Sequence, residues 1–266
     1  MQAGVIEQAA PLLKLNDVHK FNAEIFVPAA RQAEESDRVL EAIKLYNLAG
    51  EYVTVINSLA TALGTTLAAP GGGGERARSL EAAAIDIIRH YERVGRAPGR
   101  ARDAVMKLMR IREALDAKAD GKVDRALEVG VRFASHNSVD DKQIVESTDL
   151  VPLDGDVAKI NRRAEEFKEL HDSLQRNLHT YLPLAMDAIV GVYQKLKASS
   201  NTIDASRQMV RTNLLCSHMN LIYCLQTLAT LRKKSRSLMI FAGMLRYRLS
   251  PDVYSYLARL DVEVAL

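Results

Sequence analysis

Apolar residues recur along most of this 266-residue chain at the spacing of one face of a helix. One such stripe follows Gly50 at positions i, i+3, i+4, i+7 and i+11: Tyr52, Val55, Ile56, Leu59 and Leu63. A repeat near 3.6 residues predicts amphipathic helices, because a half-buried strand would alternate apolar and polar residues with a period of two. The recurrence of such stripes along the chain predicts an all-α protein.

Composition agrees with a packed helical body. Hydrophobic residues make up 48% of the chain, which is ample for a core, and only 14 Gly and 7 Pro interrupt it. The short connections between stripes favour antiparallel neighbours. We therefore predict an antiparallel helical solenoid of roughly ten to twelve helices over residues 1–266, with flexible loops near residues 68–75 and 133–150.

Capping residues predict where the helices of the N-terminal half begin and end. Ser36 precedes an apolar stripe as an N-cap would, and Gly50 follows it where a left-handed residue is needed. The next stripe starts at once, so residues 37–67 are predicted to form a helical hairpin with a very short turn.

In the C-terminal half, one long helix is predicted from about Asp156 through Leu178, with a later break at Ser199–Thr202. An apolar helix over residues 210–231 is predicted to end at a basic cluster beginning with Arg232, where cations favour the helix C-terminus. Residues 235–248 form a further helix, and Ser250 with Pro251 starts the last one.

The sequence carries no pattern typical of a catalytic, cofactor or metal site, and we expect none of the three. The motifs H-E-x-x-H, C-x-x-C, G-x-S-x-G and G-x-G-x-x-G are all missing from it. His171 lies on an apolar stripe and is interpreted as a core histidine rather than a base. Cys216 and Cys224 are eight residues apart and are interpreted as core thiols of a reducing compartment.

Charge gives little support for a polyanionic partner. The formal net charge is only +3, and the basic segment from Arg76 to Arg112 interleaves its cations with acids and contains a single aromatic residue, Tyr91. A solvated helix face is the favoured interpretation over a specific nucleic-acid or phosphoinositide site. No transmembrane segment is predicted, because polar residues interrupt the uncharged stretch at residues 212–231.

The end of the chain offers a candidate protein-binding groove. Adaptable Met side chains and amphipathic Tyr rings suit a surface that accepts a partner's amphipathic helix. The candidate groove residues are Met239, Phe241, Met244, Tyr247, Tyr254 and Tyr256. Ordinary packing between the last two helices is the alternative interpretation of the same residues.

Three stretches share a distinctive order and spacing of core residues. They are AARQAEESDRVLEAIKLYNLAGEYVTVI (29–56), LVPLDGDVAKINRRAEEFKELHDSLQRNLHTYLPLAMDAI (150–189) and FAGMLRYRLSPDVYSYLARLDVEV (241–264). Together they resemble the C-terminal half of the nucleoporin-interacting-component (Nic) family. None of the three stretches is a catalytic signature.

The resemblance implies a structural role without enzymatic activity. Members of this family are helical scaffold nucleoporins of the inner ring of the nuclear pore complex, in the nuclear envelope, and support nucleocytoplasmic transport of protein and mRNA. It also implies that the chain is a C-terminal fragment of a longer protein. The implied partners are a linker nucleoporin with short amphipathic motifs, large inner-ring scaffold nucleoporins, and channel nucleoporins bound through N-terminal regions not included here.

Two alternatives remain open at this point. The 31-residue hairpin, with Leu48 and Tyr52 near its turn, is also compatible with a TPR-like protein-interaction adaptor, although no second copy follows at a fixed period. An α-helical enzyme or RNA-binding module is the other alternative, because a helical site can assemble from residues far apart in the chain.

Overall fold

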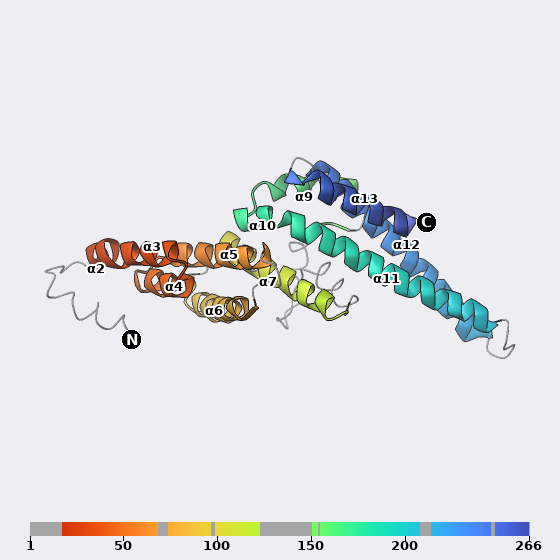
Figure 1. Cartoon of the computed structure of the whole chain (residues 1–266), viewed down its shortest axis with the longest axis horizontal. Coiled ribbons are helices and arrows are strands. Elements are labelled where there is room, and N and C mark those ends of the chain that lie inside the picture. Colours follow the sequence, from red (N-terminus) through yellow and green to blue (C-terminus); the bar gives the residue numbers. More distant parts are fainter. Residues whose placement is uncertain are drawn as a thin grey trace. The chain divides into compact units, whose positions relative to one another are not determined.

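The computed structural model describes residues 18–68, 74–96, 99–122, 151–153, 155–207, 214–245 and 248–265; of residues 18–19, 68, 199–207 and 214–224 it describes the backbone alone. Every regular element within these ranges is helical (Figure 1). The predicted loops near 68–75 and 133–150 fall mainly outside the described residues, except that residue 68 ends one helix and residues 74 and 75 begin the next.

The described residues divide into two compact units. The N-terminal unit comprises residues 1–109 and 171–174, and the C-terminal unit comprises residues 110–170 and 175–266. Each unit has its own buried apolar side chains, such as Ile56 and Leu59 in the first and Leu182 and Phe241 in the second. They are described separately below.

In the N-terminal unit, consecutive helices from α2 to α6 each pack on the next in the chain. Its elements are α2 (Val18–Phe21), the π-helical η1 (Asn22–Phe26), α3 (Val27–Glu35), α4 (Val39–Leu48), α5 (Tyr52–Ala68), α6 (Gly74–Arg93) and the first part of α7 (Gly99–Ala119). In Figure 1, α4 lies beside α3, and α3 packs on α4, α4 on α5 and α5 on α6. The predicted hairpin over residues 37–67 is therefore confirmed as α4 and α5.

The residue that follows α4 has the conformation predicted from the sequence, whereas the residue that precedes α4 is not the predicted N-cap. Gly50 has φ +79°, the left-handed conformation predicted for the residue after α4. Ser36 is not the N-cap of α4. It follows α3 and donates its hydroxyl hydrogen to the carbonyl oxygen of Gln32 at 2.8 Å. Arg38 precedes α4 without a side-chain cap, so the prediction for Ser36 was wrong.

The C-terminal unit contains longer helices. It includes the last part of α7, α9 (Val157–Phe167), part of the short α10 (Asp172–Arg176), α11 (Leu178–Arg207), α12 (Leu214–Met244) and α13 (Pro251–Ala265). Helices α11, α12 and α13 pack against one another, and α12 also packs on α9. Two predicted starts are confirmed: α9 is capped by Asp156, whose carboxylate accepts the Ala158 amide hydrogen at 2.9 Å, and α13 begins at Pro251.

Three predicted helix boundaries in this half were wrong. The long helix from Asp156 to Leu178 is interrupted at residues 168–171, where the Gln175 amide donates to the carbonyl oxygens of Lys168 and Leu170 at 3.1 and 2.6 Å. In contrast, α11 continues through the predicted break at Ser199–Thr202 to Arg207. The basic cluster at Arg232 does not end a helix either, because α12 runs on to Met244.

These errors have a common physical cause. Neither residues 199–202 nor residues 231–236 contain Gly or Pro, and Lys and Arg are good helix formers. A helix then stops where tertiary contacts satisfy its terminal carbonyl groups rather than where the local sequence becomes polar.

Candidate docking surface

The six candidate groove residues do not share one environment. The side chain of Phe241 is fully buried, with its ring 6.1 Å edge-on from that of Phe167. Residues Met239, Met244, Tyr254 and Tyr256 are partly exposed, whereas Tyr247 lies outside the described residues. Phe241 therefore packs in the core of the C-terminal unit, and a partner-binding role for the set stays a prediction.

Tyr256 takes part in a polar cluster that fastens α13 to α11. Its hydroxyl donates to Asp187 Oδ1 at 2.6 Å, and the other oxygen of Asp187 pairs with the Lys118 ammonium group of α7. The hydrogen bond to Asp187 is the main reason that the pKa of Tyr256 rises to about 12, with burial adding to it. The guanidinium of Arg259 lies 5.2 Å from the centre of the Tyr256 ring. Both the hydroxyl group and the ring face of Tyr256 therefore make contacts within the C-terminal unit.

Arg232 also acts inside the unit. Its Nε donates to the carbonyl oxygen of Val264 at 3.0 Å, and its Nη2 donates to the Tyr193 hydroxyl at 3.0 Å. A cation beside the last carbonyl groups of a helix stabilises that end. The sequence predicted this role for the helix that contains Arg232, but the structure places the guanidinium at the C-terminus of α13. The separation of 32 residues explains why local spacing missed it.

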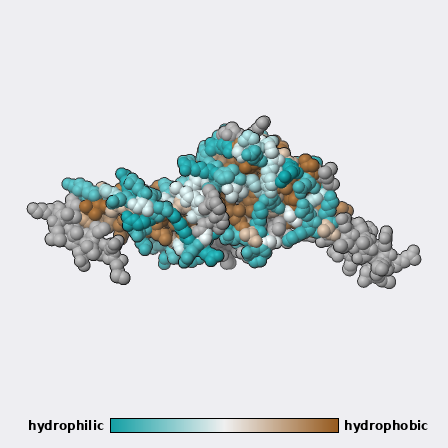
Figure 2. Space-filling view, viewed as in Figure 1, coloured by the Kyte–Doolittle hydropathy of each residue, from teal (hydrophilic) through white to brown (hydrophobic). Residues whose placement is uncertain are grey.

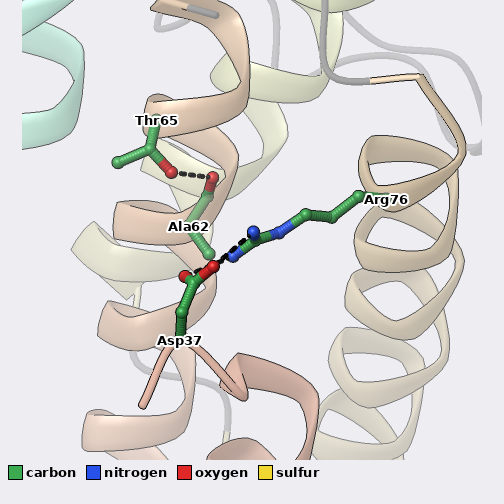
Figure 3. Close-up of polar contacts among 4 residues, drawn as sticks. All are labelled: Asp37, Ala62, Thr65 and Arg76. Atoms are coloured by element: carbon green, nitrogen blue, oxygen red, sulfur yellow. Dashed lines mark hydrogen bonds and ion pairs between the residues drawn. The ribbon is translucent and has the colours of Figure 1, made fainter. Parts of the chain in front are cut away.

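Most described arginines of the basic segment have local partners. Arg76 forms a bidentate ion pair with Asp37, with N–O distances of 2.6 and 2.5 Å, and this hydrogen bonding lowers the pKa of Asp37 (Figure 3). Arg96 donates to the Tyr52 hydroxyl at 2.5 Å, and Arg102 pairs with Glu92 at 2.5 Å. Paired cations attract a polyanion less, so these contacts favour the solvated-face interpretation.

His171 has a structural position that the sequence did not predict. It lies partly exposed between α9 and α10, and its Nδ1 accepts the Ser173 backbone N–H at 3.2 Å. It caps the start of α10 rather than filling a core.

Among the described residues, no group of three or more His, Cys, Asp or Glu side chains is placed to hold a metal ion. The side chains of Cys216 and Cys224 lie outside the description.

A groove of about 380 Å³ opens between α9 and the end of α12. Of the six candidate residues, Met244 lines it, together with Asn161, Arg162, Ala164, Glu165 and Lys168 of α9 and the residue after it. Met244 therefore faces α9, a neighbour that the sequence did not predict for it. The face of the molecule in Figure 2 is mainly hydrophilic, with hydrophobic patches between the polar areas.

Comparison with known proteins identifies the family. The family model described as Nup93/Nic96 matches residues 1–256. The chain belongs to the Nup93/Nic96 family. This membership favours the scaffold interpretation of the sequence over the TPR-like adaptor and over an α-helical enzyme.

Relatives in the Nup93/Nic96 family are much longer than this chain. Nucleoporin NIC96 of Saccharomyces cerevisiae is 25% identical over 273 residues, an alignment that covers 98% of this chain and 28% of that protein. Nuclear pore complex protein Nup93 of Xenopus laevis is 25% identical over 237 residues, covering 88% of this chain and 25% of its own length. The chain thus spans about a quarter of the length of the relatives that it matches.

A solved structure of the same family has the same fold. The crystal structure of Chaetomium thermophilum Nic96 SOL matches with a TM-score of 0.64 at 18% identity, covering 90% of this chain and 34% of that one. The likeness confirms the predicted all-α, helical-solenoid fold class. Within the described residues, no helix is both long and apolar enough to cross a bilayer.

Proposed function

We propose that this chain is a structural segment of a nuclear pore scaffold protein in the nuclear envelope, without enzymatic activity. The observation that carries the proposal is the Nup93/Nic96 match over residues 1–256, together with relatives named as a nucleoporin and as a nuclear pore complex protein. Through this role the segment supports nucleocytoplasmic transport.

The packing of the C-terminal unit suits such a role. A scaffold has to keep its helices in one arrangement while other proteins bind to its surface. The Asp187 carboxylate holds Lys118 and Tyr256 from two other helices, and Ser235 of α12 donates to Asp261 of α13 at 2.5 Å. These bonds fix the relative positions of α7, α11, α12 and α13, and leave side chains between α9 and α12 open to a partner.

The proposed partners are other nucleoporins. We assign to this segment a linker nucleoporin with short amphipathic motifs, since a groove between packed helices accepts a helical motif without rearrangement. We propose the large inner-ring scaffold and channel nucleoporins as partners outside this segment, because the chain spans only about a quarter of the length of its relatives. Specific binding to nucleic acid is not part of the proposal, because the described arginines of the basic segment are largely paired.

Localisation and cross-linking test this function. The gene product that contains this chain, tagged at its native locus, should give a punctate nuclear rim that coincides with a marker nucleoporin. Cross-links from lysines of this chain should reach other nucleoporins. A matched variant with Leu182→Arg, at a fully buried position, should lose these cross-links because it disrupts the core. Diffuse localisation of the intact protein, or cross-links to chaperones and RNA-binding proteins alone, would contradict the proposal.

A further inference from the structure

Three serines of the chain lie three residues after an arginine: Ser79, Ser135 and Ser235. Protein kinases with an acidic substrate cleft select a cation at this position, because the charge pattern of a substrate decides which kinase binds it. Ser135 lies outside the described residues. The tertiary structure distinguishes the other two serines, although their sequence pattern is the same.

Ser235 is not accessible to a kinase in the folded chain. It lies within α12, its side chain is fully buried, and its hydroxyl donates to Asp261 Oδ1 at 2.5 Å. A phosphate group there would place a charge in the core of the C-terminal unit. The arginine before Ser235, Arg232, is also engaged within this unit.

Ser79, in contrast, is exposed near the start of α6. Its hydroxyl donates to the backbone carbonyl oxygen of Glu75 at 3.0 Å, a bond within the same helix. The two neighbouring cations, Arg76 and Arg78, are exposed as well. The serine and the arginine that a kinase would select therefore lie on the surface together.

The position of Ser79 near a helix end also favours a kinase. A kinase binds its substrate in an extended form, so the first turns of α6 have to open. Helix ends open at a lower cost in free energy than helix centres. Of residues 74–80, only Ala77 and Leu80 are buried, so this opening exposes little apolar surface.

Ser79 lines a pocket of about 260 Å³ in which the charges are balanced. The pocket lies between α6 and the turn from α3 to α4, and its charged residues form two ion pairs, Arg76 with Asp37 and Arg38 with Glu41. Figure 3 shows the Arg76 guanidinium reaching from α6 to the Asp37 carboxylate. A phosphate group on Ser79 would add almost two negative charges to this balanced site.

We propose that Ser79 is a phosphorylation site for a protein kinase that selects arginine three residues before the serine, and that the phosphate takes Arg76 away from Asp37. The kinase transfers the γ-phosphoryl group of MgATP. A bond forms between phosphorus and Ser79 Oγ, the bond from phosphorus to the ADP oxygen breaks, and ADP leaves with that electron pair. The hydroxyl proton passes to a base of the kinase.

The phosphate is well placed to compete for the arginine. Arg76 lies one helical turn before Ser79 on the same side of α6, and a phosphate carries more negative charge than a carboxylate and also accepts two hydrogen bonds from a guanidinium. Loss of the Asp37–Arg76 pair would loosen α6 from the turn before α4. This inference goes beyond the proposed function and does not depend on it.

A kinase assay on the folded chain tests the acceptor. With MgATP and the catalytic subunit of protein kinase A, which selects this arginine, phosphate should enter Ser79 and not Ser235. Mass spectrometry of the tryptic peptide 79–89 identifies the position, because Ser79 is its only residue with a hydroxyl group. A synthetic peptide of residues 228–242 is the control and should be phosphorylated at Ser235, since it carries the pattern without the tertiary structure.

Two variants separate recognition of the arginine from its release. Arg76→Ala should slow phosphorylation of Ser79 by at least ~10-fold, because the selected cation is lost. Asp37→Asn should accelerate it by about 2–5-fold, the factor that corresponds to an exposed ion pair, because Arg76 is then free to bind the kinase. Glu41→Gln, in the other ion pair of the pocket, is the matched control and should leave the rate unchanged.

A carboxyl titration by NMR tests the competition for Arg76. The hydrogen bond from Arg76 lowers the pKa of Asp37 in the unmodified chain. Phosphorylation should raise this pKa at least to its ordinary value of 3.8, because the carboxylate loses its cation and gains a negatively charged neighbour.

Three outcomes would overturn the inference. No phosphate at Ser79 while the 228–242 peptide is phosphorylated would show that α6 does not open to the kinase. Equal incorporation at Ser79 and Ser235 in the chain would show that the kinase acts only on unfolded protein. An unchanged pKa of Asp37 after phosphorylation would show that Arg76 stays with Asp37.

Discussion

Each of the two units is stabilised by side-chain hydrogen bonds between its own helices, but these bonds join residues that lie at different distances along the chain. In the N-terminal unit, the Glu34 carboxylate of α3 accepts hydrogen bonds from Tyr46 of α4 at 3.1 Å and Ser58 of α5 at 2.7 Å, so one side chain joins three successive helices. In the C-terminal unit, Asp187 joins Lys118 and Tyr256, each 69 residues away. The first unit is therefore organised by neighbours in sequence, and the second by residues that meet only after the whole chain has folded.

The largest expected effect is the loss of a buried ring from the C-terminal unit. Phe241→Ala should lower the free energy of unfolding by about 3–5 kcal/mol, because it removes a fully buried side chain and leaves a cavity against Phe167. Hydrogen exchange should show the main loss of protection in α9 and α12. An equal loss in α4 and α5 would contradict the separation of the two units.

Removal of the Asp187 charge tests the long-range contacts. Asp187→Asn should lower the free energy of unfolding by about 1–3 kcal/mol, because its side chain is largely buried and is hydrogen-bonded to two partners. Chemical denaturation measures the change. Glu34→Gln is the matched variant in the N-terminal unit. A smaller loss for Asp187→Asn than for Glu34→Gln would mean that sequence distance is not what distinguishes the units.

Each unit contains a tyrosine whose pKa is raised to about 12, for different reasons. Burial is the main cause for Tyr91, whereas the hydrogen bond to Asp187 is the main cause for Tyr256. Because both pKa values exceed the ordinary value of 10 in the unfolded chain, the stability that these groups contribute is complete below pH 10 and is lost as the pH rises towards 12.

Asp187→Asn should separate these two causes. The substitution should lower the pKa of Tyr256 and leave that of Tyr91 unchanged. Tyrosinate absorbance measures both, with Tyr91→Phe and Tyr256→Phe assigning the late-titrating groups. A fall in the pKa of Tyr91 would show that the Asp187 carboxylate acts across both units.

A smaller effect is expected at the tight turn between α4 and α5. Gly50→Ala should destabilise the protein by about 1–2 kcal/mol, because Gly50 has φ +79° and an L residue is strained there. No heavy atom lies within 4 Å of the added Cβ, so the cost is conformational and not steric. Gly99→Ala is the matched control, since Gly99 begins α7 without a positive φ. A similar loss for both variants, measured by thermal unfolding, would rule out the backbone explanation.

The smallest effect is expected at the Asp37–Arg76 ion pair. Both side chains are mainly exposed, so Arg76→Ala should change the melting temperature only slightly, and the change should vanish at high salt. The pKa of Asp37 should rise towards its ordinary value, as a carboxyl titration by NMR would show. Arg78→Ala provides a control at an exposed position nearby. A large, salt-independent loss of stability would indicate that this pair organises the N-terminal unit.

Sequence pattern alone determined the helical fold class and the inward faces of the helices. Val55, Ile56, Leu59 and Leu63 form the predicted stripe, and each is buried. Gly50 and Pro251 were also predicted at their turns, because a left-handed conformation and a first-turn position each favour one residue type over all others. Such local signals are strong because they depend only on the backbone at that position.

Tertiary structure decided where the long helices end and which of them meet. Helix propensities of most residues differ by less than about 1 kcal/mol, so a polar stretch without Gly or Pro neither stops a helix nor forces it to continue. Packing then settled that α12 passes through Arg232 and that Phe241 faces inward while Met244 borders a groove with α9. The sequence showed that Phe241 and Met244 are apolar. Only contacts between helices far apart in the chain determined that Phe241 is buried and that Met244 stays accessible to a partner.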